Sequence, residues 1–334
     1  MNTPAKSHAV IAQGTHRALE VQLQCPQCGA LVGTLREDEF PPEFLYSCAT
    51  CFFQMLNEDG VWKALPRRRA AHFTQFMREY QVVREAEGRV SSNPEYYLAL
   101  PYQDLSGHNR KQWAIRARTY RFVEQKILPR IESRTGRELK ILDLGAGNGW
   151  MSYRLALRSH WPVAIDLLAS ETDGLAAAVH YRKKLPGLFP RFQAEFSRLP
   201  FADSQFDLAI FNASFHYVED YAETLGEAIR CLRPGGTVII ADTAWYRREE
   251  SGRRMLAERQ KAFIERFGFP SDGLASLEYL TDERLAALAK CFGLRWKTYS
   301  PFYGVRWLMR PTLAKLKGRR EPSRFRIYLA EVEK

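Results

Sequence analysis

The sequence predicts an α/β protein built around a largely parallel sheet, with a small cysteine-containing module in front of it. Three observations support this prediction. From about residue 137, apolar runs of strand length alternate with segments of helical periodicity, which is typical of a parallel sheet with helical crossovers. The first apolar run, residues 140–144, leads into a glycine-rich turn. Nearer the N-terminus, four cysteines form two pairs with the spacing of metal ligands.

The length and composition fit an ordinary globular chain. At 334 residues it can form one main domain and a smaller appendage. No run approaches the roughly 18 apolar residues of a membrane span, and the first twenty residues lack a signal-peptide core. We therefore expect a cytoplasmic protein with no transmembrane segment. The net charge of +11 favours a polyanion or an anionic membrane surface as a partner.

The N-terminal part is predicted to be a mobile tail, residues 1–18, followed by a zinc ribbon, residues 19–66. Cys25 and Cys28 form one C-x2-C knuckle, and Cys48 and Cys51 form a second one. Two such knuckles supply four thiolates for a tetrahedral Zn²⁺, and a site of this kind is structural because no coordination position stays open. The alternative is a ribbon that keeps its thiols without metal.

Residues 67–118 are predicted to form a helical linker that lies over the main domain as a lid. A helix begins after Pro66 with three consecutive arginines, which either contact phosphate or start a solvated helix. A second helical pattern ends before Gly136. Tyr97 and Tyr102, between the two helices, and Trp113, on the second helix, either line a substrate pocket or pack the linker against the main domain.

The main domain begins with a buried strand that ends in an acid and a turn. Glycines alternate through this turn at 145, 147 and 149. Without a Cβ atom a turn takes positive φ, and a ligand can lie against its backbone at the start of the next helix. Trp150 stands where a dinucleotide fingerprint has its third glycine, so NAD is disfavoured.

Four further strands are expected, and polar or acidic residues follow several of them. Asp166 ends the second strand, Glu195 follows the third, and Asn212 follows the fourth. Because parallel strands end at one edge of a sheet, these side chains should surround one cleft with the glycine turn. The expected ranges are 161–166, 191–194, 206–211 and 237–241.

Several motifs, in order, resemble the class I S-adenosylmethionine (SAM) methyltransferases, in particular the group that contains the quinone-biosynthesis and sterol enzymes. The motifs are Asp-x-Gly-x-Gly-x-Gly from Asp143, Leu199-Pro200-Phe201 with Phe206-Asp207, His216-Tyr217-Val218-Glu219-Asp220, and Leu232-Arg233-Pro234-Gly235-Gly236. The resemblance covers roughly residues 119–245 and implies a Rossmann-like, seven-stranded methyltransferase sheet within residues 119–334. The ribbon resembles those of methyltransferase activator proteins and of some ribosomal-RNA guanine methyltransferases.

The resemblance also implies a set of SAM-binding residues. The glycines would hold the methionine end of SAM, Asp166 the ribose, and Glu195 with Phe196 the adenine. Family enzymes often have Asp at the position of Glu195, and the longer side chain still offers an acceptor for the adenine amine. The predicted cofactor-binding residues are Asp143, Gly145, Ala146, Gly147, Gly149, Asp166, Leu167, Glu195, Phe196 and Asn212.

The C-terminal third is less regular. We expect a largely helical insertion at about 246–280, a helix capped by Thr281, and strands near 294–299 and 325–329. The basic segment 303–320 has six positive charges and no acid between Val305 and Arg320. It either contacts a membrane surface or nucleic acid, or covers the sheet edge. Cys231 and Cys291 are expected to be buried thiols.

Three functions remain open from the sequence. The favoured one is methylation of a small-molecule or lipid-like acceptor, because the segments expected around the cleft contain many aromatic residues. His216, just after the fourth strand, is the candidate general base, although the favoured interpretation of this residue is a packed or capping histidine before the next helix. The first alternative is an RNA methyltransferase that grips rRNA or tRNA through the ribbon and the basic surface. The second is a non-catalytic SAM-fold binding module.

Overall fold

The structure is a computed structural model, and it describes residues 20–36 and 45–333. The predicted mobile tail lies outside these residues. The strands are β1 Glu20–Gln24, β2 Leu31–Arg36, β3 Leu45–Ser47, β4 Gln54–Glu58, β5 Val61–Lys63, β6 Lys140–Leu144, β7 Trp161–Asp166, β8 Arg191–Gln193, β9 Phe206–Asn212, β10 Leu232–Ala241, β11 Lys297–Tyr299 and β12 Ile327–Glu331. The helices are α1 Arg67–Ala86, α2 Pro94–Ala99, α3 Arg110–Phe122, η1 Val123–Ile127, α4 Leu128–Thr135, α5 Trp150–Ala156, η2 Leu175–Lys183, η3 Phe215–Tyr217, α6 Tyr221–Cys231, α7 Glu249–Phe267, α8 Asp282–Phe292, α9 Val305–Leu308 and α10 Arg310–Leu316.

The predicted seven-stranded sheet is confirmed. Strands β6 to β12 lie in the order β11-β12-β10-β9-β6-β7-β8. Neighbours from β8 to β10 are parallel, and β12 runs antiparallel to both β10 and β11. This is the Rossmann-like arrangement of the class I methyltransferase fold. Strand order reverses between β6 and β9, which is where open α/β sheets bind their ligands.

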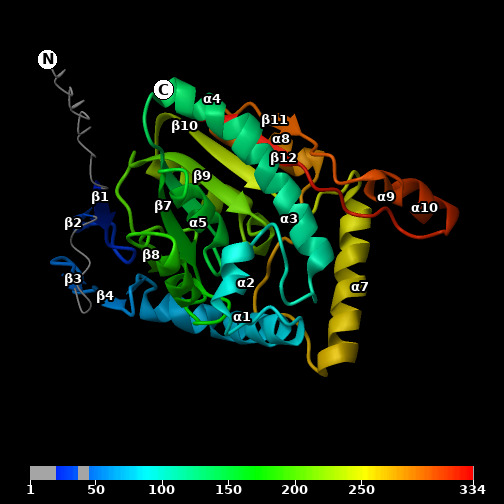
Figure 1. Cartoon of the computed structure of the whole chain (residues 1–334), viewed down its shortest axis with the longest axis horizontal. Helices are drawn as coiled ribbons and strands as arrows, with labels where there is room; N and C mark the ends of the chain where they lie inside the picture. Colours follow the sequence, from blue (N-terminus) through cyan, green and yellow to red (C-terminus); the bar gives the residue numbers. More distant parts are fainter. Residues whose placement is uncertain (1–19, 37–44, 334) are drawn as a thin grey trace, which may run out of the picture.

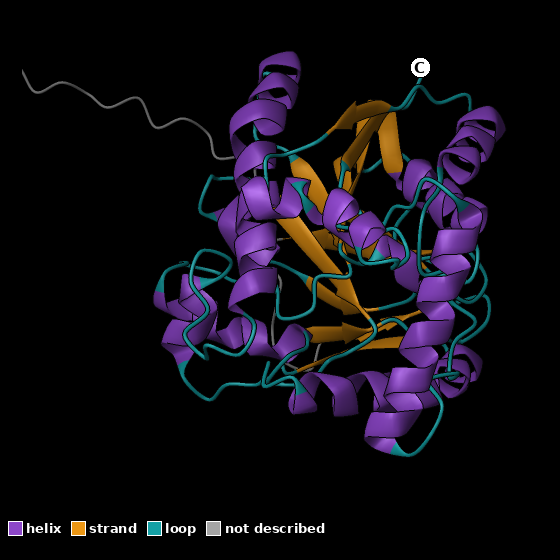
Figure 2. Cartoon of the chain, turned by 90° about the vertical axis from the view of Figure 1, so that its right-hand side faces the viewer, coloured by secondary structure: helices purple, strands orange, loops and turns teal. Residues whose placement is uncertain are grey.

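Helices cover both faces of the sheet, as Figure 2 shows. Residues of β6 alternate between two cores, because Leu142 and Leu144 pack into one and Ile141 into the other. The first core includes Leu225 of α6 and Leu285 of α8. The second includes side chains of α3, α4, α5 and η2. In Figure 1, α3 and α4 lie along the top of the molecule, and α1 lies along the bottom.

The ribbon is joined to the main sheet and shares a hydrophobic core with it. Strand β5 pairs in parallel with β8, so β5, β4 and β3 extend the sheet to ten strands among the described residues. Trp62 of β5 is buried in the same core as Leu142. Strand β1 also contacts the loop after β8, where Gln24 N donates to Pro200 O at 3.1 Å and Ala202 N to Gln22 O at 3.0 Å. The ribbon therefore holds both ends of the segment that carries Glu195.

The segment after β7 becomes helical only at Leu175, where the 3-10 helix η2 begins. The Asp173 carboxylate just before it pairs with Arg84 of α1. Cys231 is buried as expected, whereas Cys291 is exposed on α8. In the part of the chain that the structure describes, none of the helices combines the length and the apolar character needed to span a membrane.

Candidate active site and metal centre

The carboxyl ends of the central strands meet at one edge of the sheet. The pairing sets Leu144 opposite both Ile165 and Phe211, and Asn212 opposite Ala241. The residues that follow these strands therefore surround one cleft, as the strand pattern predicts.

The glycine turn approaches its neighbours closely at Gly145. The φ of Gly145 is +84°, and a Cβ atom there would lie 2.2 Å from the Cβ of Ser214. Only glycine fits this combination of backbone angle and space. The preceding Asp143 faces away from the cleft, and its carboxylate accepts hydrogen bonds from Ser152 N at 3.1 Å and Ser152 Oγ at 2.7 Å. Asp143 thus fixes the start of α5 behind the turn.

Asp166 links the end of β7 to the glycine turn. Its Oδ2 accepts a hydrogen bond from Gly147 N at 2.8 Å, and its Oδ1 accepts one from Leu168 N at 2.9 Å. Burial raises the pKa of this carboxyl, while the two backbone amides lower it. Each oxygen keeps a second lone pair. The carboxylate is held in place and retains acceptor capacity toward the cleft.

Helix α1 contributes a cationic side chain that the sequence pattern left undecided. Arg69 donates to the Glu195 carboxylate, with Nε 2.8 Å from Oε2 and 3.0 Å from Oε1. The Glu195 side chain is only 2% exposed. Arg67 and Arg68 are exposed, as expected of a solvated helix start. Of the three arginines, Arg69 therefore belongs to the cleft.

An open cavity, called here the first cavity, lies between α1 and the strand ends. Among the predicted cofactor residues, five line it: Gly145, Asp166, Leu167, Glu195 and Phe196. The other five predicted residues do not line this cavity. They are Asp143, Ala146, Gly147, Gly149 and Asn212. Helix α1 closes the cavity with Arg69, Phe73, Phe76 and Tyr80.

A second open cavity adjoins the first one. Phe76, Tyr80, Ala213, Tyr217 and Leu274 line both, so the two spaces share a wall. This wall comes from α1 and from the segment after β9. The two cavities are therefore neighbours, with these side chains between them.

His216 lines the second cavity. Its Nδ1 is buried without a hydrogen-bond partner in the described part of the chain. Burial lowers the pKa of His216 to about 4, so the ring is neutral at pH 7. Its Nδ1 is therefore available toward the cavity.

Asp242 also lines this cavity, and the sequence prediction missed it. It directly follows β10, and the acids of the predicted site likewise stand at or just after the ends of strands. Its Oδ1 accepts a hydrogen bond from Thr119 Oγ1 at 2.6 Å, whereas Oδ2 is buried without a partner among the described residues. Burial raises the pKa of Asp242 to about 6. Its φ of +50°, uncommon for a residue with a side chain, holds it in this position.

The aromatic residues expected around the cleft mostly pack elsewhere. Tyr97 stacks on His180 with ring centroids 4.4 Å apart, and Trp113 meets Trp150 edge to face. Tyr102 is 38% exposed and lines neither cavity. The structure therefore favours the packing alternative for these three side chains. Tyr217 does line both cavities.

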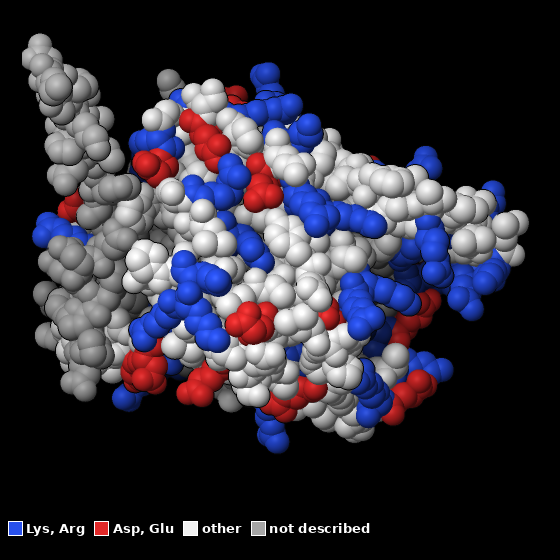
Figure 3. All heavy atoms as spheres, in the orientation of Figure 1, with Lys and Arg blue, Asp and Glu red and all other residues white. Residues whose placement is uncertain are grey.

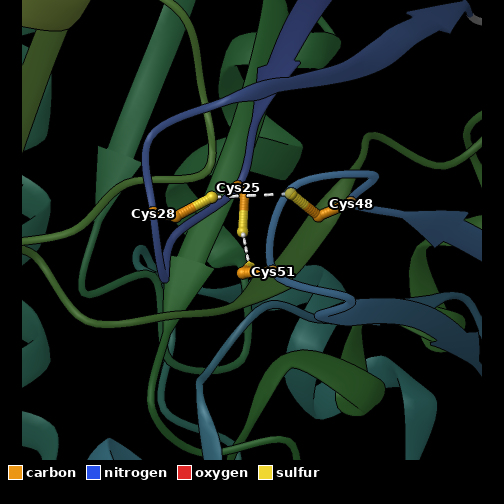
Figure 4. Close-up of side chains that lie close together, drawn as sticks. All are labelled: Cys25, Cys28, Cys48 and Cys51. Atoms are coloured by element: carbon orange, nitrogen blue, oxygen red, sulfur yellow. Dashed lines mark hydrogen bonds between the residues drawn. The ribbon is translucent and has the colours of Figure 1, made fainter.

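The four knuckle cysteines converge on one point (Figure 4). All four Sγ atoms lie within 4.8 Å of one another, with Cys25 and Cys51 at 3.5 Å and Cys28 and Cys48 at 3.5 Å. Zinc–sulfur bonds of about 2.3 Å give a tetrahedron with edges of about 3.8 Å. The sulfur positions fit such a tetrahedron closely.

Residues 142–240 match the family model described as a methyltransferase domain. This part of the chain is a methyltransferase domain. Its bounds contain the glycine turn, the strand-end residues Asp166, Glu195 and Asn212, and His216. Asp242 lies just beyond them.

Two curated relatives match about a third of the chain. A malonyl-[acyl-carrier protein] O-methyltransferase of Erwinia pyrifoliae is 33% identical over 113 residues, which are 33% of this chain and 39% of the relative. A demethylmenaquinone methyltransferase of Mycobacterium marinum is 34% identical over 109 residues, which are 33% of this chain and 43% of the relative. The chain thus spans about two fifths of the length of these relatives.

Solved structures of the same kind align over more of the chain. The 1,6-didemethyltoxoflavin-N1-methyltransferase of Burkholderia thailandensis, with bound 1,6-didemethyltoxoflavin and S-adenosylhomocysteine, is 17% identical, with a TM-score of 0.43, covering 73% of this chain and 92% of that one. A SAM-dependent methyltransferase of Mesorhizobium loti is 21% identical, with a TM-score of 0.40, covering 58% and 91%.

Proposed function

We propose that the protein is a SAM-dependent methyltransferase that acts on a small-molecule or lipid-like acceptor. The observation that carries the proposal is the first cavity of the methyltransferase domain, where Gly145, Asp166 and Glu195 meet at the strand ends. The names of the curated relatives, which include a demethylmenaquinone methyltransferase, support a small-molecule acceptor.

In this proposal each cleft residue has a defined task toward SAM. The Gly145 backbone lies against the methionine end, where a side chain would collide with Ser214. Asp166 accepts hydrogen bonds from the ribose hydroxyls through its remaining lone pairs. Glu195 accepts one from the adenine amine, and Phe196 packs on the ring. Arg69 orients Glu195 from α1.

SAM supplies a methyl group bound to a positively charged sulfur, and the sulfur keeps the electron pair of the broken bond, which leaves S-adenosylhomocysteine. The protein contributes by positioning the acceptor in line with that bond and by excluding water. An acceptor hydroxyl or amine releases a proton during the transfer. His216 Nδ1 and Asp242 Oδ2 are the two unpartnered acceptors in the second cavity that can take it.

The ribbon in this proposal holds one structural Zn²⁺ on Cys25, Cys28, Cys48 and Cys51. The sulfur geometry supports it. Because the ribbon pairs with β8, the metal would also stabilise the edge of the methyltransferase sheet.

Calorimetry with SAM and a methyl-transfer assay test the function together. Full-length protein is incubated with methyl-labelled SAM and, separately, an organic extract or total RNA from its source cells. We expect SAM to bind and the label to enter the extract. Absence of SAM binding would refute the enzyme proposal, and label entering RNA at a discrete nucleotide, but not the extract, would replace it with RNA methylation.

The basic segment supports a docking role at an anionic membrane surface. Helices α9 and α10 protrude from the body of the molecule (Figure 1). Leu308 is 62% exposed and Leu316 is 79% exposed, and Lys315, Lys317 and Arg319 beside them are exposed too. Exposed leucines next to basic side chains suit the boundary between lipid headgroups and acyl chains, whereas phosphate contacts alone need no leucine. A membrane location would bring the active site close to lipid-like acceptors.

A further inference from the structure

The second cavity contains an arginine cluster at a place where the sequence predicted a largely apolar lining. Arg84, Arg89, Arg116 and Arg259 line it, together with the acids Glu79, Glu87, Asp242 and Glu278. Two of the arginines are fully paired. Arg84 donates to Asp173 at 2.8 Å, and Arg259 donates to Glu278 at 2.6 Å. Glu79 accepts from Gln75 at 2.8 Å and from Gly273 N at 3.1 Å.

The other two arginines keep donors free. Arg89 is 2% exposed and donates to Glu87 and Gln112, but its Nη1 is buried with no partner among residues 20–36 and 45–333. Leaving a charged donor buried and unpaired is costly, so a built site usually supplies an acceptor. Arg89 also lines the second cavity, which has room for such an acceptor.

Arg116 is the second arginine with free donors. Its guanidinium lies 4.9 Å from the ring centroid of Trp113, and it makes no hydrogen bond or ion pair to the residues that the structure describes. The ring fixes the guanidinium from one side and satisfies none of its N–H groups. Burial, together with the charges of Arg89 and Arg84, lowers the pKa of Arg116 to about 10, so it stays charged at pH 7. The charge of Asp242 raises the pKa of Arg116, although the two side chains do not form an ion pair.

We propose that the methyl acceptor is an acid whose anionic oxygen group, a carboxylate or a phosphate, is bound by Arg89 and Arg116. This inference rests on the proposed function and names the substrate class of the same site. Guanidinium groups recognise such oxygens with paired N–H donors. The nucleophilic hydroxyl or amine of the acceptor lies toward the wall shared with the first cavity, and its proton passes to Asp242 or His216 as the new bond to the methyl carbon forms.

The test uses the full-length protein, methyl-labelled SAM and a metabolite extract of the source cells. Before the reaction, an anion exchanger at pH 7 divides the extract into retained and unretained fractions. We expect label only in products of the retained fraction, and we expect those products to bind the exchanger again. Label only from the unretained fraction would overturn the proposal. Loss of anion-exchange binding by the product would also overturn it, because the anionic group would then be methylated and not held by the arginines.

Variants connect the result to the two arginines. Arg116→Gln and Arg89→Gln should each raise KM for the acidic acceptor by about tenfold to a hundredfold, the loss of a charged hydrogen bond. Lys111→Gln removes an exposed charge from α3, the helix that carries Arg116, and should leave KM unchanged. SAM binding by calorimetry should match that of the wild type in all three variants, which establishes that they fold. Wild-type KM in both arginine variants would refute the assignment.

Two further measurements distinguish the kind of anionic group and separate failure of this proposal from failure of the proposed function. Phosphatase treatment of the retained fraction abolishes labelling if the group is a phosphate, and leaves it intact if the group is a carboxylate. Either result supports an anionic oxygen group. If the wild type binds no SAM and labels neither fraction, the proposed methyltransferase function itself fails, whereas SAM binding with label from neutral acceptors refutes the acidic acceptor alone.

Discussion

At the scale of single residues, the methyltransferase site consists of carboxylates held in different ways. Asp166 is fixed by two backbone amides, Glu195 by a guanidinium, and Asp242 by one hydroxyl. Of these, only Asp242 has a buried oxygen left without a partner among the described residues. Asp166 and Glu195 are thus suited to accept hydrogen bonds from a ligand, and Asp242 is suited to accept a proton.

Asp166→Ala should weaken SAM binding by about 1–3 kcal/mol, which is about fivefold to 150-fold. The ribose hydroxyls would lose a charged acceptor, and Gly147 N would lose its partner. Isothermal calorimetry measures the change. Glu171→Ala removes an exposed carboxylate from the loop that follows and should bind SAM as the wild type does. Equal affinity of the Asp166 variant and the wild type would exclude Asp166 as a cofactor residue.

Asp242→Asn should make the protein more stable and less active. Burial raises the pKa of Asp242 to about 6, above the ordinary value of 3.8 for an aspartate side chain. The folded state therefore holds this proton more tightly than the unfolded state, and ionisation of the carboxyl destabilises the fold as pH rises from about 4 to 6. Asn stays neutral and avoids this loss.

The gain in unfolding free energy for Asp242→Asn should be about 1–3 kcal/mol at pH 7.5 and should diminish toward pH 4. Urea unfolding at several pH values measures it. Glu138→Gln, at an exposed carboxylate outside both cavities, serves as the control and should show no such pH-dependent gain. In the activity profile, an acidic limb near pH 6 that disappears in the Asp242 variant would identify Asp242 as the base, and a limb near pH 4 would identify His216.

At the scale of elements, two segments outside the matched domain form or support the first cavity, which is the proposed cofactor site. Helix α1 forms one wall with Phe73, Phe76 and Tyr80 and orients Glu195 through Arg69. The ribbon supports the same region from the other side, since β5 pairs with β8 and β1 bonds to the loop at Pro200. The cofactor site is therefore sensitive to changes in the ribbon.

Removal of zinc should destabilise the whole protein and weaken SAM binding. The ribbon shares its core with the methyltransferase sheet, so loss of the metal should release β5 from β8 and loosen the Glu195 segment. A strong chelator, or Cys48→Ser, should lower the single melting temperature and increase hydrogen exchange in β8. Cys291→Ser changes an exposed cysteine on α8 and should have no effect. A ribbon that unfolds while SAM affinity stays unchanged would contradict this coupling.

At the scale of the whole molecule, positive charge and exposed apolar surface coincide at one end. Figure 3 shows blue side chains beside white ones on the protruding end that α9 and α10 form in Figure 1. The second cavity lies on the body of the molecule, between α1 and α7. The proposed membrane-docking surface and the proposed acceptor cavity are thus in different parts of the molecule. A substitution can change one of them without changing the other.

The protein should bind vesicles that contain phosphatidylserine, and it should bind pure phosphatidylcholine vesicles much more weakly. Leu308→Ser with Leu316→Ser should reduce vesicle binding by at least about tenfold, because two exposed leucines no longer enter the interface. Leu157→Ser, at an exposed leucine after α5, is the control. Co-sedimentation measures binding. Equal binding by the double variant and the wild type would exclude α9 and α10 as the docking surface.

The sequence by itself determined the strands of the main sheet, the glycine turn, the acids at 166 and 195 and the cysteine knuckles, because each depends on local periodicity or on fixed spacing. Tertiary structure alone decided which distant residues complete them. Arg69 meets Glu195 across 126 positions, and Thr119 meets Asp242 across 123. Nothing in the local pattern distinguishes Arg69 from Arg68, or Arg116 from other helical arginines. Their surroundings differ only once α1 and α3 pack against the sheet, since burial and the loss of water decide which charges remain without a partner.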